Sequence, residues 1–343
     1  MGNEASCCNT NIDPKSETQL TKNNQKLNIH TMHESNIRIP DDEMGKSQHP
    51  VATKSVAMSL DGDYDGQASA NYRVTFKSLE LPEHFVVSQQ IQAMVNNKPP
   101  KLHPSANGGS PMERKKLNLG SGTYYGESRD GLPEGWGCLL RPDGALVVGQ
   151  FLHGHVEGNS SVYFPDGSSF QGEWIKGRLQ GKGEFEDGKG GFYRGDWKDD
   201  LQWGQGEETK PGEYTYKGSF EAGERHGRGQ LILAEGSSYS GGFEHDKFAG
   251  KGIYMWPDGK IYDGEWKDGM MNGQGEFKWP DGKKYVGRYL HDQKHGYGIL
   301  YWPTGARYEG DWKEGKQHGK GRLVLPTGEV AENTWVNGVV QRK

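Results

Sequence analysis

The chain has 343 residues, of which 53 are glycine, and its formal net charge at pH 7 is −5. Because basic residues are not in excess, the charge balance argues against nucleic-acid binding and against an electrostatic clamp on anionic lipid. No apolar run approaches the length of about 18 residues that a membrane-spanning helix needs, and no secretory signal is recognisable, so we expect neither a membrane span nor export.

Residues 1–8 contain a candidate lipidation motif. Gly2 and Ser6 stand four positions apart, which fits the N-myristoylation pattern. One myristoyl chain gives only marginal membrane binding, so a stable anchor needs a second signal. Cys7 and Cys8 are placed to supply that signal as palmitoylated thiols. The motif predicts an acylated N-terminus; an unmodified start with two free thiols is the alternative.

The next segment is predicted to be a disordered tether. Residues 9–55 are rich in Asn, Thr, Ser, Lys and Gln and contain few aromatic residues. Such a composition buries too little apolar surface to offset the entropy that ordering costs. Residues 101–116 return to a similar linker composition, with prolines, glycines and a short basic cluster.

Residues 56–100 differ from the linkers on either side of them. Alternation of large apolar residues at 72–76 indicates a short strand. Between positions 83 and 96 four apolar residues fall on one face of a helix: Val87, Ile91, Met94 and Val95. We expect this segment to dock on the body of the protein or to cap its N-terminal edge. A partner-binding helix and disorder are the alternatives.

From residue 117 to residue 343 the chain repeats one frame of 23 residues. In one unit the frame reads Tyr262, Gly264, Trp266, Gly269, Gly273, Gly275, Asp281 and Gly282. The nine full units begin in register at Tyr124, Val147, Phe170, Tyr193, Tyr216, Tyr239, Tyr262, Tyr285 and Tyr308. A tenth half-unit holds Ala331, Asn333, Trp335 and Gly338. Self-similarity at a fixed period indicates a repeat architecture.

Each unit is predicted to be a β-hairpin. Residues 262–267 alternate between uncharged and charged side chains, and residues 273–279 alternate between small or aromatic residues and polar or charged ones, which is the period of a strand. Asp268 and Gly269 lie between the two runs, and 280–282 read Pro-Asp-Gly, so both connections have turn chemistry. We therefore expect an all-β fold, an elongated single-layer antiparallel meander of about nine and a half hairpins.

The large and small residues of a unit are expected to share one face of the sheet. Cross-strand neighbours lie only about 5 Å apart, so a ring can lie over the backbone of a neighbouring glycine. We assign this packing role to Trp174, Trp197, Trp266, Trp312, Gly264, Gly273 and Gly275.

The frame Tyr-x-Gly-x-Trp-x-x-Gly-x-x-x-Gly-x-Gly resembles the MORN repeat (membrane occupation and recognition nexus). The resemblance covers residues 124–338, about two thirds of the chain. It implies an elongated antiparallel sheet that serves as a scaffold, and pairing of arrays through their terminal repeats. Some units depart from the frame. The fifth position is Ser128, Phe151, Phe220, Phe243 or Tyr289; the turn glycine is Asp200, Asp246 or Asp292; and Ser160 replaces a strand glycine.

No catalytic or metal-binding constellation stands out in the sequence. His291 and His295 are four residues apart, but they fall in a hairpin turn and not on a helix. Cys138 lies in a predicted strand without an evident base, which favours packing over reactivity. We therefore expect a protein that is not an enzyme and uses no metal and no cofactor.

The sequence predicts a scaffold on the cytoplasmic face of a membrane, at the plasma membrane or a cortical or ciliary membrane system. It would hold cytoskeletal or membrane-contact proteins. Alternatives are an axonemal component similar to radial-spoke proteins, and a phosphoinositide-sensing module that regulates a lipid kinase in trans. Trp335, Val336 and Val339 mark the C-terminal edge as a surface for a homodimer, since the half-unit is expected to lack a second strand to cover Trp335.

Overall fold

The structure is a computed structural model, and it describes residues 72–73, 75–76, 79–80, 86–97 and 113–341. The predicted lipidation motif, the tether at 9–55 and residues 98–112 lie outside the described residues. None of the helices that the structure describes is both long and apolar enough to cross a membrane.

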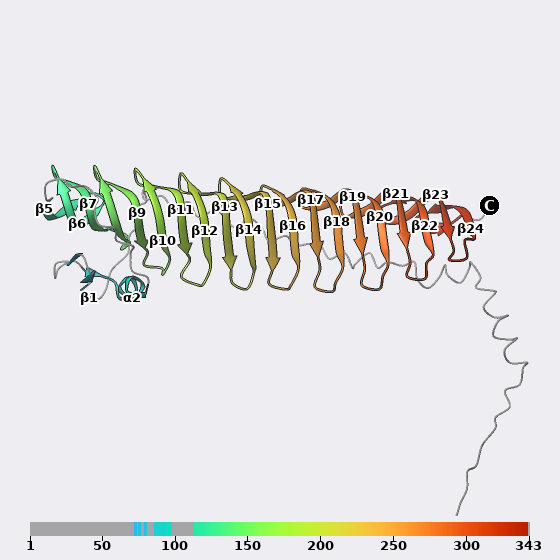
Figure 1. The fold of residues 1–343 in the computed structure, drawn as a ribbon, viewed down its shortest axis with the longest axis horizontal. Helices are drawn as coiled ribbons and strands as arrows, with labels where there is room; N and C mark the ends of the chain where they lie inside the picture. Colours follow the sequence, from blue (N-terminus) through green and yellow to red (C-terminus); the bar gives the residue numbers. More distant parts are fainter. Residues whose placement is uncertain (1–71, 74, 77–78, 81–85, 98–112, 342–343) are drawn as a thin grey trace, which may run out of the picture.

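The described chain is dominated by one open antiparallel sheet of 21 strands, in which each strand pairs with the next one along the sequence (Figure 1). Within the described residues β5 pairs only with β6, and β25 only with β24, so the two ends of the sheet do not meet. This confirms the predicted all-β meander. The strands are β5 (Glu113–Leu119), β6 (Gly122–Arg129), β7 (Leu132–Leu140), β8 (Leu146–Leu152), β9 (His155–Tyr163), β10 (Ser169–Ile175), β11 (Arg178–Glu186), β12 (Phe192–Lys198), β13 (Leu201–Lys210), β14 (Tyr214–Glu221), β15 (Glu224–Leu233), β16 (Ser238–Glu244), β17 (Lys247–Met255), β18 (Ile261–Lys267), β19 (Met270–Lys278), β20 (Lys284–Leu290), β21 (Gln293–Tyr301), β22 (Arg307–Lys313), β23 (Lys316–Val324), β24 (Val330–Val336) and β25 (Val339–Val340).

Tyr262 shows why each unit needs both a ring and two glycines. Its side chain is fully buried and lies over Gly264 and Gly275, which face each other across β18 and β19. A Cβ atom at Gly264 would lie 2.4 Å from the Tyr262 hydroxyl oxygen, and one at Gly275 would lie 2.5 Å from the ring. The hydroxyl donates a hydrogen bond to the Glu265 carbonyl at 3.0 Å. We call this side of the sheet the ring face and the opposite side the charged face.

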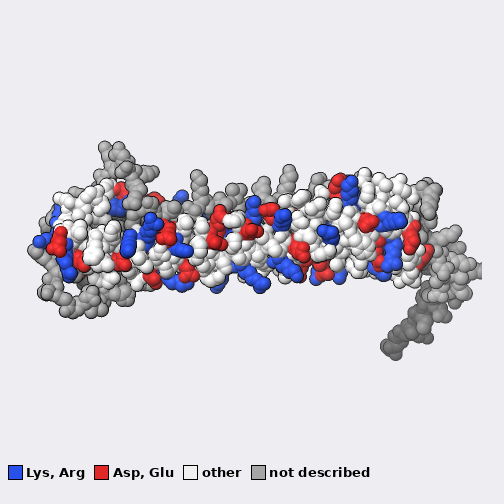
Figure 2. Space-filling model, turned by 90° about the horizontal axis from the view of Figure 1, so that it is seen from above, with Lys and Arg blue, Asp and Glu red and all other residues white. Residues whose placement is uncertain are grey.

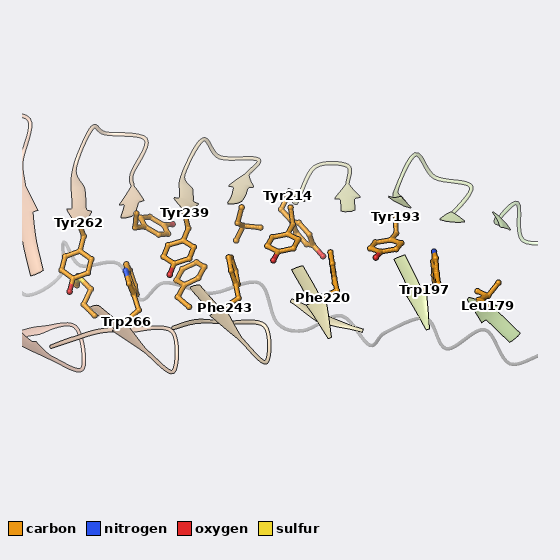
Figure 3. Close-up of a cluster of buried hydrophobic side chains, with 14 of the residues drawn as sticks. Leu179, Tyr193, Trp197, Tyr214, Phe220, Tyr239, Phe243, Tyr262 and Trp266 are labelled. Atoms are coloured by element: carbon orange, nitrogen blue, oxygen red, sulfur yellow. The ribbon is translucent and has the colours of Figure 1, made fainter. Parts of the chain in front are cut away.

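The rings form a continuous ladder along the ring face (Figure 3). Tyr262 meets Trp266 of its own unit edge to face, with centroids 5.1 Å apart, and meets Tyr289 of the next unit at 5.2 Å. The same two contacts recur from Phe170 to Tyr308. Each unit is therefore packed against both of its neighbours, as a repeat protein requires.

Gly273 has a different role from the one that its place in the frame suggested. Its φ is +92°, at a bulge where β19 has two more residues than β18, and it does not lie beneath a ring. The Glu265 carboxylate accepts a hydrogen bond from the Gln274 amide at 3.3 Å beside this bulge. The backbone conformation, rather than ring packing, therefore explains glycine at this position.

The hairpin turns also connect neighbouring units. Asp268 and Gly269 both have positive φ, as a two-residue primed turn requires. Where aspartate replaces the glycine, it keeps a positive φ and gains a partner: the Asp292 carboxylate accepts the Met271 amide at 2.7 Å. The carboxylates of Asp200 and Asp246 likewise accept a hydrogen bond from the backbone amide of the residue 21 positions earlier. These aspartates therefore strengthen the contact between hairpins.

The N-terminal segment packs on the charged face, not on the ring face. Helix α2 (Gln89–Asn97) begins after Ser88, whose hydroxyl accepts the Ile91 amide as an N-cap does. Buried Ile91 and Val95 contact an apolar patch of β7–β9 that includes Cys138, Leu146, Val148 and Tyr163. Short strands β1 (Tyr72–Arg73), β2 (Thr75–Phe76), β3 (Leu79–Glu80) and β4 (Val86–Val87) pair as β1–β4 and β2–β3.

Both ends of the array are longer than the sequence suggested. Strand β5 begins at Glu113, four residues before the expected start of the array. The half-unit at the C-terminus does have a second strand, β25, and Val340 pairs with Trp335. Trp335 is only 2% exposed and packs against Tyr308 at a centroid distance of 5.0 Å. The expectation that Trp335 lacks a covering strand is therefore wrong.

Candidate binding site on the ring face

The described residues contain no group of three or more His, Cys, Asp or Glu side chains that could hold a metal ion. His291 lies in the turn between β20 and β21, and His295 lies within β21. Cys138 is fully buried beneath α2, and this burial raises the pKa of its thiol well above the ordinary range. A protonated, inaccessible thiol is a poor nucleophile, so Cys138 serves packing.

The side of the molecule seen in Figure 2 carries interspersed charges of both signs. Many of these groups are paired, as in Glu309, whose carboxylate accepts from Arg307 at 2.5 Å and from Arg322 at 2.6 Å. These two guanidinium groups hold the pKa of Glu309 below its usual value. Figure 2 shows no large patch of one sign, so the visible face has no electrostatic preference for an anionic or a cationic surface.

One position of the frame on the ring face is charged in a single unit. The residue 15 positions after the first ring is apolar in eight units and charged only at Glu208. Glu208 lies directly opposite Tyr193 and Tyr216 across its two strand pairs, so its carboxylate enters the row of rings. The position two residues further along the frame holds a half-buried tryptophan in three units of the C-terminal half. In two successive earlier units the same position holds Asp187 and Lys210. The ring face is therefore interrupted near β13.

A groove of about 140 Å³ lies at this interruption. The residues that line it include Tyr193, Trp197, Tyr214 and Phe220, which Figure 3 labels. Glu208 and Lys210, the two residues that break the repeat, are among the residues that line this groove.

Tyr214 is an additional ring that the frame does not require. Other units place alanine, serine, glycine, lysine or glutamate at this position, two residues before the first ring. The Tyr214 side chain is 5% exposed, and its hydroxyl donates to the Glu208 carboxylate at 2.9 Å. The Lys210 ammonium lies 5.8 Å from the centre of the Tyr214 ring. Together these contacts hold Glu208 and Tyr214 in place on the groove wall.

Arg225 is a buried cation that also lines this groove. Its side chain is 5% exposed and donates from Nε to Asp246 at 2.8 Å. The guanidinium also lies 5.3 Å from the centre of the Tyr214 ring and 5.8 Å from that of Tyr216. Its Nη1 atom is buried and has no hydrogen-bond acceptor. A buried donor without an acceptor costs about 1–3 kcal/mol, and more when the group is charged.

The equivalent position three units later is Lys294, which is also buried among rings. Its ammonium lies 5.4 Å from Trp279, 5.5 Å from Tyr285 and 5.3 Å from Trp312, measured to the ring centres. Half-buried Trp279 packs there against the body of the ring face, in the place that Lys210 takes beside Arg225. The buried cation therefore recurs at Lys294, whereas the charged neighbours Glu208 and Lys210 do not recur there.

Among the residues singled out from sequence, Trp174, Trp197, Trp266 and Trp312 lie on the ring face and are buried. Val336 and Val339 are 43% and 63% exposed at the C-terminal end. The lipidation residues lie outside the described part of the chain. Sequence reasoning missed the groove, although a comparison of all nine units at the positions of Glu208 and Lys210 would have indicated it.

An open, single-layer sheet of tandem hairpins defines this protein as a repeat scaffold or binding module, a type that is generally non-catalytic. The MORN-repeat family model matches more than half of the chain, and the chain belongs to the MORN-repeat family. The matched stretches are 124–146, 170–192, 193–212, 216–238, 239–261, 262–284, 285–307 and 308–330. The unit from 147 to 169 is not matched, yet it forms the hairpin of β8 and β9; it starts with Val147 in place of a ring.

No curated protein matches the chain. Among solved structures, the wild-type TCP10 domain of Danio rerio CPAP is similar with 12% identity and a TM-score of 0.32 over 64% of this chain and 100% of that one. The G-box domain of the microcephaly protein CPAP is similar with 10% identity and a TM-score of 0.24, over 65% and 100% of the two chains. Likeness at this level says nothing about function.

Proposed function

We propose that this protein is a non-catalytic scaffold, held on the cytoplasmic face of a membrane by acyl groups, that presents its extended sheet to cytoskeletal or membrane-contact proteins. The open sheet of 21 strands is the observation that carries the scaffold role. At a spacing of about 4.8 Å per strand it reaches on the order of 100 Å, which is long enough to hold several partners apart. Its charged face and ring face offer two chemically different surfaces.

Lipid anchoring is supported by the pattern of Gly2, Ser6, Cys7 and Cys8. The mixed charges of the visible face in Figure 2 favour acyl chains over the sheet itself as the source of membrane affinity. A second copy of the chain is proposed to pair at the C-terminal edge, where Val336 and Val339 are exposed. Burial of Trp335 restricts that contact to the valines and the strand edge.

We expect Gly2→Ala to move the full-length protein from the membrane fraction to the soluble fraction, because alanine at this position cannot be N-myristoylated. The Cys7→Ser, Cys8→Ser variant is expected to keep only weak, reversible association, as one myristoyl chain provides. Fractionation of cells that express each tagged variant at equal level measures both effects. Asn3→Ala preserves the motif and is the matched control.

Unchanged pelleting of the Gly2→Ala protein would exclude acylation as the anchor. If that variant stayed on a ciliary axoneme, the axonemal alternative would replace the proposal. Binding of the unacylated chain to vesicles that contain phosphoinositide headgroups would instead favour a lipid-sensing module.

A further inference from the structure

We propose that the groove beside Arg225 binds one large apolar side chain of an extended segment of a partner protein, with the neighbouring backbone carbonyl as the acceptor for the Arg225 guanidinium. We call this groove the Arg225 groove. This inference rests on the proposed scaffold function. It adds the chemistry of one contact between the scaffold and its partner protein.

The aromatic walls indicate the apolar part of the ligand. Rings of Tyr193, Trp197, Tyr214 and Phe220 line the Arg225 groove. Sites for drug-sized molecules or cofactors usually occupy about 300–1,000 Å³. The Arg225 groove has about 140 Å³ and is therefore suited to a single side chain rather than to a whole cofactor.

The buried guanidinium indicates the polar part of the ligand. Arg225 uses Nε for Asp246, whereas Nη1 has no acceptor. A ligand oxygen that reached Nη1 would remove an unpaired buried donor, so that hydrogen bond would favour binding. Because arginine carries no acceptor, the ligand atom must accept rather than donate.

The charges of the lining favour a neutral acceptor. Asp187, Glu208 and Asp246 line the groove together with Lys210 and Arg225, which gives three carboxylates for two cations and a net charge of −1. A carboxylate ligand would add a further negative charge to this excess. An ammonium ligand would lie beside the Arg225 guanidinium and could not accept from it. A peptide carbonyl is uncharged and can accept a hydrogen bond from the Arg225 guanidinium, so it suits the site.

The occupant is therefore a protein segment rather than a free metabolite. Its backbone supplies a neutral carbonyl, its side chain fills the aromatic walls, and both are attached to one residue. An extended backbone presents its carbonyls and side chains in alternate directions along its length, so one residue can reach both parts of the site.

The test uses N-acetyl-L-leucine N-methylamide as the probe and the full-length, unacylated chain labelled with 5-fluorotryptophan. Trp197 lines the groove, and its ¹⁹F resonance can be assigned with Trp197→Phe, since phenylalanine takes the same position in other units. We expect a saturable shift of this resonance on titration. N-acetyl-L-leucinate, which adds a negative charge to the carboxylate excess, and isopentylammonium, which has no acceptor for Arg225, are each expected to bind at least about tenfold more weakly.

Two variants remove the site by different routes. Arg225→Met with Asp246→Gly copies residues that other units use at these positions, such as Met271 and Gly269, and should abolish the shift of Trp197. Glu208→Leu with Lys210→Trp copies Leu300 and Trp302 and should fill the groove while it stabilises the sheet. Lys294→Met is the matched control and should bind the amide normally.

The proposal is overturned if the amide produces no shift of Trp197 at tens of millimolar, or if either double variant binds as the parent does while its other tryptophan resonances show an intact fold. Tighter binding of the leucinate or of the ammonium would also overturn it. Because the probe is soluble and the chain carries no lipid, these results are independent of the membrane fractionation, and the two proposals can fail separately.

Discussion

Replacing Gly275 by valine is expected to destabilise the array by about 3–5 kcal/mol, one of the largest effects that a single residue of this sheet can have. A Cβ atom at Gly275 would lie 2.5 Å from both the Tyr262 ring and its hydroxyl oxygen. Tyr262 is fully buried, so its ring can move only by breaking the hydrogen bond to Glu265 and the edge-to-face contact with Trp266. Urea unfolding followed by tryptophan fluorescence measures the loss.

Gly120→Val is the matched control for this substitution. A Cβ atom at Gly120 meets no other atom within 4 Å, and its φ is not positive. Its free energy of unfolding should change by no more than about 0.5 kcal/mol. Equal unfolding curves for Gly275→Val and the parent protein would show that Tyr262 does not lie over Gly275.

Trp266→Ala is expected to cost about 3–5 kcal/mol, but locally rather than globally. The Trp266 ring contacts Tyr239 at 5.5 Å, Phe248 at 5.3 Å and Tyr262 at 5.1 Å, and its Nε1 donates to the Gly252 carbonyl at 3.0 Å. These contacts join two units of the array. In a one-dimensional array the units beside the lost ring should open before distant ones.

Hydrogen exchange can resolve this pattern along the chain. We expect faster amide exchange in Trp266→Ala over residues 239–284 and parental protection over residues 124–169. Tyr297→Ala provides the control, because the Tyr297 side chain is 57% exposed and its loss should cost less than about 0.5 kcal/mol. Uniform loss of protection in Trp266→Ala would mean that the sheet unfolds as one cooperative body.

The hairpins and their register could be predicted because both depend on local pattern. A 23-residue period and two-residue alternation place Tyr262, Gly264 and Trp266 on one face, where the structure has them. Asp268-Gly269 is sufficient to predict the turn. The hydrogen bond from Met271 to Asp292 could not be predicted, since it joins residues of different hairpins whose distance depends on the stagger of the strands.

The Arg225 groove was not predicted because, within a single unit, Glu208 and Lys210 look like ordinary charged residues of an alternating strand. A comparison of the nine units singles these two positions out, and strand pairing then places Glu208 opposite Tyr193 and Tyr216. Likewise, the burial of Cys138 depends on α2, which lies some 40 residues earlier in the chain.

The central claim is that the repeats form one continuous, extended sheet that can act as a scaffold. Small-angle X-ray scattering of the full-length chain, at a concentration where light scattering reports a single mass, tests it most directly. An array of 21 strands at about 4.8 Å predicts rod-like scattering with a long dimension of at least about 100 Å. A compact particle, with a radius of gyration near the value of about 20 Å expected for a globular chain of this length, would contradict it.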